Sequence, residues 1–236
     1  MQGHRILDLH SADAADLGDR RGVSSIVSMQ STEGSGGRSI AMMGRRVILW
    51  LDIAVKIGLL ALLLHAVANP DLQQYSGKAM LGRALSYPVI LFLVPAIWWL
   101  RLRPRAYPTV IDLLITAPFL IDVAGNALDL YDSIWWWDDA NHFFNWMLIT
   151  AGVALALRWT GLGRLNCFCL AVGFAAVSAI LWEFAEYITF IRFSSELETA
   201  YTDTLGDLFL GLLGGTVGAA IVGLTSPRVT ERAGGA

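Results

Sequence analysis

The chain has 236 residues, of which 55% are hydrophobic and 16% charged, and its mean hydropathy is +0.54. Soluble domains carry about 45–50% apolar and about 25% charged residues, so these values exclude a disordered chain and argue against an ordinary soluble domain. The net charge of −3 offers no basic surface for nucleic acid. Cys167 and Cys169 are too close in sequence for an ordinary disulfide and lack the C-x-x-C spacing of a redox pair.

Residues 1–41 contain no apolar run and include Ser-rich and Gly-rich segments. We interpret them either as a disordered cytoplasmic tail or as an over-called start, because the sequence Met-Met-Gly-Arg-Arg at 42–46 resembles the opening of an inner-membrane protein. Residues 42–226 are predicted to form one transmembrane domain, and residues 227–236 a short cytoplasmic tail.

Six apolar stretches in that domain are each long enough, at about 20 residues, to cross a bilayer. They cover residues 46–68, 84–100, 109–129, 139–157, 166–190 and 204–224. The sequence therefore predicts an all-α integral membrane protein, a bundle of six transmembrane helices.

Basic residues alternate between the two ends of these stretches, nine at one side against three at the other. The positive-inside rule places the richer side in the cytoplasm, so both termini are expected to be cytoplasmic, in a bacterial inner membrane. The nine are Arg45, Arg46, Arg101, Arg103, Arg105, Arg158, Arg164, Arg228 and Arg232, and the three are Lys78, Arg83 and Arg192.

Acidic residues and one histidine gather at the predicted non-cytoplasmic ends of the last four stretches. Several are three or four residues apart, which places them on one helix face. The set comprises Asp122 and Asn126, then Asp138, Asp139 and His142, then Glu183 and Glu186, then Asp203 and Asp207.

On the sixth stretch the acidic face continues into glycines, including the G-x-x-x-G of Gly214 and Gly218. Small residues let helices approach closely, so the acidic face is expected to be the packed face of this helix.

A charged side chain in a span costs about 2.5–3.5 kcal/mol, so these carboxylates are expected to be protonated, to hold a metal or to line a water-filled cleft. A His with Asp and Glu suits one divalent ion of Zn, Mn or Fe. We predict Asp139, His142, Glu186 and Asp207 as ligands, Glu183 and Glu186 as catalytic groups, and Asp122, Asn126 and Asp203 as supporting residues.

Some of these polar residues also have simpler interpretations than a metal site. Asp138 and Asp203 also suit helix N-caps, and His142 suits a hydrogen-bonded packing residue. Asp52 and Lys56, four residues apart, are predicted to form an ion pair within the first helix. Asp112 is interpreted as an interfacial residue.

Three runs, WDDANHF at 137–143, WEFAEY at 182–187 and DTLGDL at 203–208, together resemble the YjdF-like family of bacterial inner-membrane proteins, a domain of unknown function. The order D-x-x-H, E-x-x-E, D-x-x-x-D is also distantly similar to VanZ-like membrane proteins. Those usually have E-x-x-Q and a later Asn, where this chain has Glu186 and Gly211. The resemblance covers roughly residues 45–225 and implies an inner-membrane protein without implying an activity.

These observations leave three functional hypotheses. The first is a metal-assisted hydrolase or transferase that acts on a lipid or lipid-linked substrate at the outer leaflet. The second is a proton-coupled permease, and the third is an accessory or structural subunit of a membrane complex. Protein partners and homo-oligomers are compatible with all three.

Overall fold

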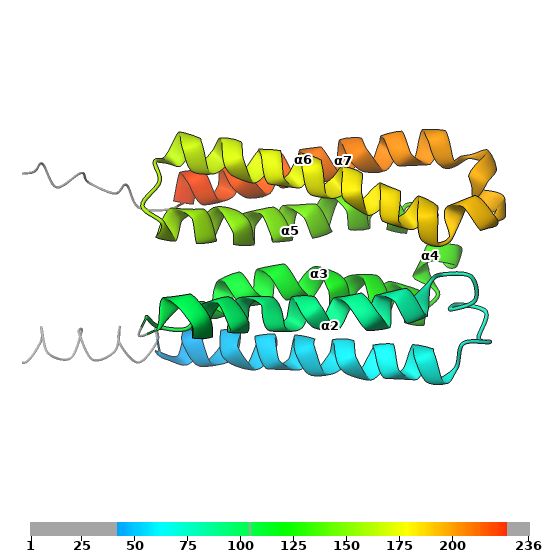
Figure 1. Cartoon of the computed structure of the whole chain (residues 1–236), viewed down its shortest axis with the longest axis horizontal. Coiled ribbons are helices and arrows are strands. Elements are labelled where there is room, and N and C mark those ends of the chain that lie inside the picture. The colour runs from blue at the N-terminus through cyan, green and yellow to red at the C-terminus, as the bar shows by residue number, and fades with distance from the viewer. Residues whose placement is uncertain (1–41, 104, 226–236) are drawn as a thin grey trace, which may run out of the picture. The chain divides into compact units, whose positions relative to one another are not determined.

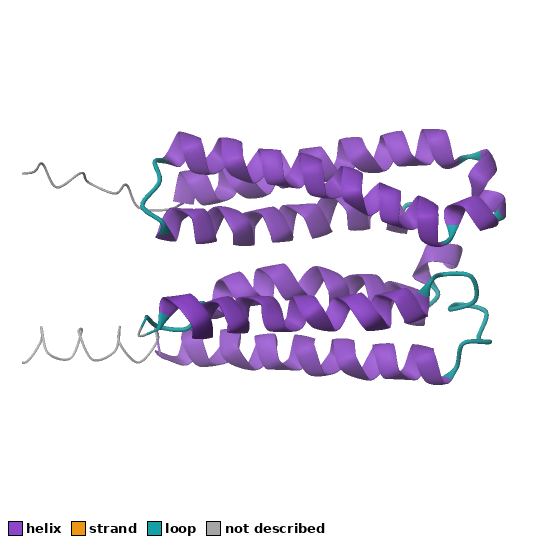
Figure 2. Cartoon of the chain, viewed as in Figure 1, coloured by secondary structure: helices purple, strands orange, loops and turns teal. Residues whose placement is uncertain are grey.

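The computed structural model describes residues 42–103 and 105–225, so the predicted tails at 1–41 and 227–236 lie outside the described residues. The described residues from Ile48 onward belong to one compact unit. Of the residues before that unit, 42–47 are described and are helical. Figure 2 shows helices and loops, and the described residues include no strand.

Within the described residues, six helices are long and apolar enough to cross a membrane, which confirms the predicted number of spans. Apolar segments of this length are helical in lipid because a helix satisfies its backbone hydrogen bonds internally. The chain is an all-α, multi-pass membrane protein. The six are the first helix (Met42–Ala68), α2 (Met80–Ile97) continued by the π-helix η1 (Trp98–Leu102), α3 (Thr109–Ala127), α5 (Trp137–Trp159), α6 (Arg164–Thr189) and α7 (Ala200–Thr225).

Three short helices lie in the connections: α4 (Leu130–Ser133), η2 (Ile191–Phe193) and η3 (Ser195–Glu198). Several spans begin before the apolar stretches that predicted them. The difference matters most for α2, which starts at Met80 instead of residue 84 and so includes Arg83 in the helix. At the other side of the bundle, Gly161 adopts a φ of +84° after α5, a left-handed conformation that suits glycine at a helix end.

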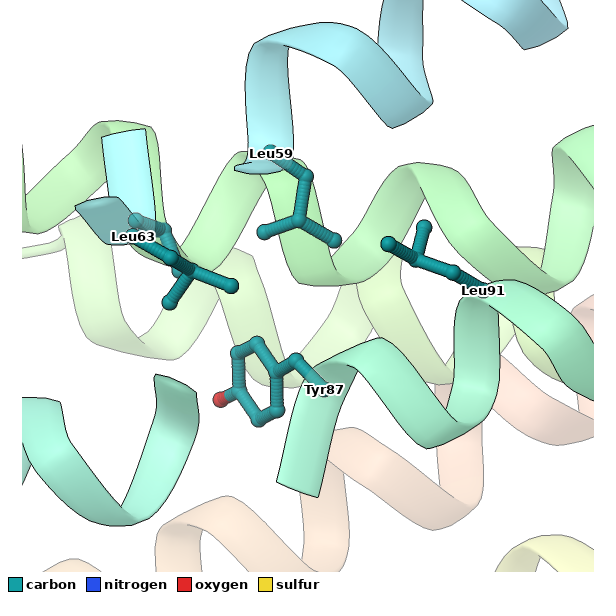
Figure 3. Close-up of a cluster of buried hydrophobic side chains, with 5 residues drawn as sticks. Leu59, Leu63, Tyr87 and Leu91 are labelled. Carbon is teal, nitrogen blue, oxygen red and sulfur yellow. The ribbon is translucent and has the colours of Figure 1, made fainter. Parts of the chain in front are cut away.

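Figure 1 shows the first helix, α2 and α3 running alongside one another, and α5, α6 and α7 forming a second group. Helix α5 packs against α6 and α7 and also against α3, so it joins the two groups. A buried apolar cluster holds the first group together, and four of its members are labelled in Figure 3. The cluster contains Leu59, Leu63, Tyr87, Leu91 and Val123.

Glycines on α7 let it lie directly against the backbone of α5. A Cβ added at Gly214 would collide with the backbone carbonyl of Phe143, and one added at Gly218 would collide with that of Met147. Asp207 lies two helical turns before Gly214, so it shares this packed face and is buried. The prediction that the acidic face of this helix packs into the bundle is confirmed for Asp207.

Candidate functional site

His142, in the second turn of α5, is buried, with 7% of its surface exposed. Its Nε2 lies 3.7 Å from Oδ1 of Asp138 and 3.7 Å from Oδ1 of Asp207, and its Nδ1 lies 3.7 Å from Oε1 of Glu183. These separations exceed a hydrogen bond, and the imidazole has no hydrogen-bond partner among the described residues. Buried polar groups are normally hydrogen-bonded, so ring nitrogens with only these longer contacts suit a bound ligand between the ring and the carboxylates.

The carboxylates around His142 come from three helices. Asp138 lies one turn earlier on α5, while Glu183 is on α6 and Asp207 on α7. Together with Glu186, these residues form what we call the His142 cluster. The close approach of α7 to α5 brings Asp207 within reach of the ring.

Two overlapping groups in the His142 cluster have potential ligand atoms within 4.8 Å of one another. One is Asp138, His142 and Asp207, and the other is His142, Glu183 and Glu186. An ion held at about 2.1 Å by tetrahedral ligands separates two ligand atoms by about 3.4 Å. The 3.7 Å separations around the ring are close to that value. One imidazole with several carboxylates is a donor set suited to Zn²⁺, Mn²⁺ or Fe²⁺.

Negative charge in the cluster has little compensation from the protein. Of Glu183, Glu186 and Asp207, only Glu186 lies within 4.0 Å of a Lys or Arg in the described part of the chain. That contact joins Oε1 of Glu186 to Nη2 of Arg83. Because buried carboxylates in a span are costly when unpaired, a divalent cation would offset their charge.

Asp122 on α3, by contrast, is fully partnered. Its Oδ2 accepts hydrogen bonds from Nε of Arg83 at 2.9 Å and from the hydroxyl of Tyr87 at 2.6 Å, and its Oδ1 accepts one from Tyr131 at 2.9 Å. Burial and the Asp122 charge raise the pKa of Tyr131, which lies in α4 between two spans. Asp122 therefore positions Arg83 and the two phenols.

Arg83 links three elements. Besides its bond to Asp122, its Nη1 donates to the backbone carbonyl of Lys78, just before α2. Its Nη2 faces Glu186 on α6 at 4.0 Å, beyond hydrogen-bond distance. The guanidinium thus ties α2 to α3 and leaves one nitrogen directed toward the His142 cluster.

A cavity of about 80 Å³ lies between the two helix groups, with room for several water molecules. Its polar wall includes Asp122, Tyr131, Asp138, His142 and Glu186. Aromatic residues form much of the remaining wall, including Phe119, Trp146 and Trp182. The arrangement is a partly open site for an ion and a small polar group.

Some of the predicted site residues are not brought to the cluster. Asp139 is exposed and belongs to neither potential ligand group, and Asp203 is also exposed. Asn126 is buried, but its Nδ2 donates to the backbone carbonyl of Asp122 at 3.0 Å. The structure places the other predicted residues together: His142, Glu183, Glu186 and Asp207, with Asp122 on the cavity wall.

The sequence interpretation included Asp138 in the acidic set without assigning it a site role, and it missed Arg83, Tyr87 and Tyr131 as site residues. Asp138 lies inside the first turn of α5, after the cap at Trp136, so it is not the predicted N-cap. Its spacing of four residues from His142 indicates a shared helix face, but Asp139, three residues from His142, has the same signal. The tyrosines carry no comparable signal, because tyrosines near span ends commonly serve as interface residues.

A second buried ionic group joins the first helix to α3. Nζ of Lys56 lies 3.0 Å from Oδ2 of Asp52, which confirms the predicted ion pair, and also contacts Asp112. Tyr107 donates a hydrogen bond to Asp112 as well. Asp112 lies in the first turn of α3, near the end of the span as expected, but it is fully buried. Lys56 and Tyr107 therefore supply the partners that water would supply to an exposed carboxylate. We assign this group to helix packing.

Comparison with known proteins returns one family. A family model described as "Predicted membrane protein (DUF2238)" matches residues 51–228. This match supports the YjdF-like resemblance, while the VanZ-like one stays a prediction. No curated protein and no solved structure matches the chain significantly.

Proposed function

Because the chain belongs to the DUF2238 family of predicted membrane proteins, we propose a function from the chemistry of its own residues. It is a metal-dependent hydrolase or transferase of the bacterial inner membrane that acts on a lipid or lipid-linked substrate. The single observation that carries this proposal is the buried imidazole of His142. The ring has no hydrogen bond among the described residues and faces carboxylate oxygens from three helices at 3.7 Å.

The roles of the side chains follow from their positions. His142, Asp207 and Asp138 or Glu183 supply an imidazole and carboxylates for one ion of Zn²⁺, Mn²⁺ or Fe²⁺. When bound, such an ion polarises a substrate oxygen or activates water. Glu186 lines the cavity and belongs to the second potential ligand group, and it acts as the general base that accepts the proton of the attacking water. The aromatic wall limits access of bulk water to this chemistry.

The proposal includes a membrane orientation. The alternation of basic residues supports cytoplasmic termini, and the His142 cluster would then lie near the outer leaflet. Fusing alkaline phosphatase or green fluorescent protein after residue 225 tests this orientation. Fluorescent fusions without phosphatase activity are expected, and active phosphatase at that position would reverse the assignment.

Elemental analysis of the purified protein tests the metal site directly. The intact chain is expected to carry about one Zn, Mn or Fe ion, and His142→Ala and Asp207→Asn are expected to lose it. Asp139→Asn is the matched control, because Asp139 is exposed and lies on the same helix. Equal metal content in His142→Ala and the intact chain would contradict the proposal.

A further inference from the structure

A second hollow lies between α2 and α6, on the side of Glu186 away from His142. Its volume is about 290 Å³, several times that of the central cavity at about 80 Å³. Gly82, Ser86 and Ala185 lie along its exposed rim, and Arg83, Tyr87 and Glu186 form its inner wall. We call this hollow the α2–α6 groove.

The groove and the central cavity share three wall residues: Tyr87, Trp182 and Glu186. Glu186 therefore belongs both to the wall of the groove and to the His142 cluster, and no helix lies between the two spaces. A group in the groove consequently lies next to the cluster.

Arg83 gives the groove a specific chemistry. Its Nε and Nη1 are committed to Asp122 and to the carbonyl of Lys78. Its Nη2 faces Oε1 of Glu186 at 4.0 Å, a long ion pair beyond hydrogen-bond distance, and Tyr87 also lies beside the guanidinium. Nη2 is thus the guanidinium nitrogen least committed to the protein, and guanidinium donors favour phosphate oxygens.

The surroundings of the groove favour a lipid over a soluble ligand. Both of its walls are membrane spans, so it opens on the side of the bundle. Beyond its rim, Val89 on α2 and Leu181 on α6 continue an exposed apolar surface, at 64% and 61% exposure. A molecule with a charged headgroup and an acyl chain would place its headgroup at the polar inner wall of the groove and its chain along this apolar surface.

We propose that the α2–α6 groove binds a phosphate-bearing lipid that enters sideways from the bilayer, with its phosphate on Nη2 of Arg83 and its reacting bond directed at the His142 cluster. This inference rests on the proposed function, because a metal ion bound by His142 and its neighbouring carboxylates offsets the negative charge that an incoming phosphate would otherwise meet. It narrows the substrate class from lipids in general to lipids with a phosphate headgroup.

Binding of radiolabelled lipids to the delipidated protein in detergent tests the proposal. Three probes are compared: phosphatidylglycerol, diacylglycerol with the same chains, and glycerol 3-phosphate. Saturable binding of phosphatidylglycerol is expected. Diacylglycerol should bind at least about tenfold more weakly because it lacks the charge-assisted hydrogen bond of the phosphate, and glycerol 3-phosphate at least about tenfold more weakly because it lacks the acyl chains. Equal binding of diacylglycerol would show that Arg83 does not recognise the phosphate. Equal binding of glycerol 3-phosphate would identify a soluble phosphate ligand. Either result overturns the proposal.

A substitution that fills the groove tests its location. A side chain at Gly82 points into open space, so Gly82→Phe is expected to fold, to keep its metal content and to lose saturable phosphatidylglycerol binding. Gly173→Phe on α6 is the matched control, because that position is exposed and equally open. Undiminished binding by Gly82→Phe contradicts the groove. Metal analysis of the same samples separates failure of the groove proposal from failure of the metal site. An intact chain that binds phosphatidylglycerol but carries no metal contradicts only the proposed function.

Discussion

Nε of Arg83 on α2 lies 2.9 Å from Oδ2 of Asp122 on α3, at the border between the α2–α6 groove and the central cavity. The pair is largely buried, with 11% and 8% of the two side chains exposed. It fixes the guanidinium in a membrane span by giving it an anionic partner on the neighbouring helix. The pair also determines which nitrogen of Arg83 remains for a ligand.

Breaking this pair is expected to destabilise the bundle. Asp122→Asn leaves a buried guanidinium without its counter-ion, and we expect the free energy of unfolding to fall by about 3–5 kcal/mol. Tyr87→Phe removes one hydrogen bond to the same carboxylate and should cost about 1.5–3 kcal/mol. Denaturant unfolding in mixed micelles measures both. If Asp122→Asn lowers the free energy of unfolding no more than Tyr87→Phe does, the ion pair contributes little to stability.

Alkaline pH should weaken the same network through Tyr131. Burial raises the pKa of this phenol, so the folded state holds its proton above the ordinary value of about 10. Its contribution to stability is therefore complete below about pH 10 and is lost as the pH rises further, because the unfolded state then releases the proton more readily. The stability of Tyr131→Phe, measured between about pH 8 and pH 11, should fall less steeply than that of the unmodified chain. Parallel curves would contradict this expectation.

Neighbouring acids on the same helix should differ in their effect on metal binding. Asp138→Asn is expected to weaken binding of Zn²⁺ by about tenfold or more, whereas Asp139→Asn should leave it unchanged, because Asp138 faces His142 and Asp139 is exposed. Asp207→Asn and Asp203→Asn form a second pair with the same expectation on α7. Competition with a chromogenic chelator measures the affinities. If both substitutions of either pair change the Zn²⁺ affinity equally, the ion does not bind at the His142 cluster.

Glycines on α7 should respond to alanine according to their distance from α5. Gly214→Ala places a methyl group against the backbone carbonyl of Phe143, and we expect it to destabilise the protein by about 1–3 kcal/mol. Gly223→Ala meets open space and should be neutral or stabilising by up to about 1 kcal/mol. Thermal unfolding in detergent compares the two. Similar melting temperatures would mean that α7 does not lie directly on α5.

Hydropathy and loop charge were sufficient to predict the six spans, because each apolar stretch reflects a simple transfer free energy. The residue types of the site were equally visible, since carboxylates in spans are costly and therefore rare. The choice between Asp138 and Asp139 could not be made, because it depends on how α5 is rotated against α6 and α7. Arg83 was counted with the loop cations, and only the start of α2 at Met80 places it inside a helix.

Anomalous X-ray diffraction from crystals of the intact protein, recorded at the absorption edge of the metal found by elemental analysis, tests the central claim most directly. We predict an anomalous peak about 2.0–2.2 Å from a ring nitrogen of His142 and within a similar distance of carboxylate oxygens from Asp207 or Glu183. A metal-loaded protein with no peak there, and with the His142 ring hydrogen-bonded directly to a carboxylate, would contradict the account.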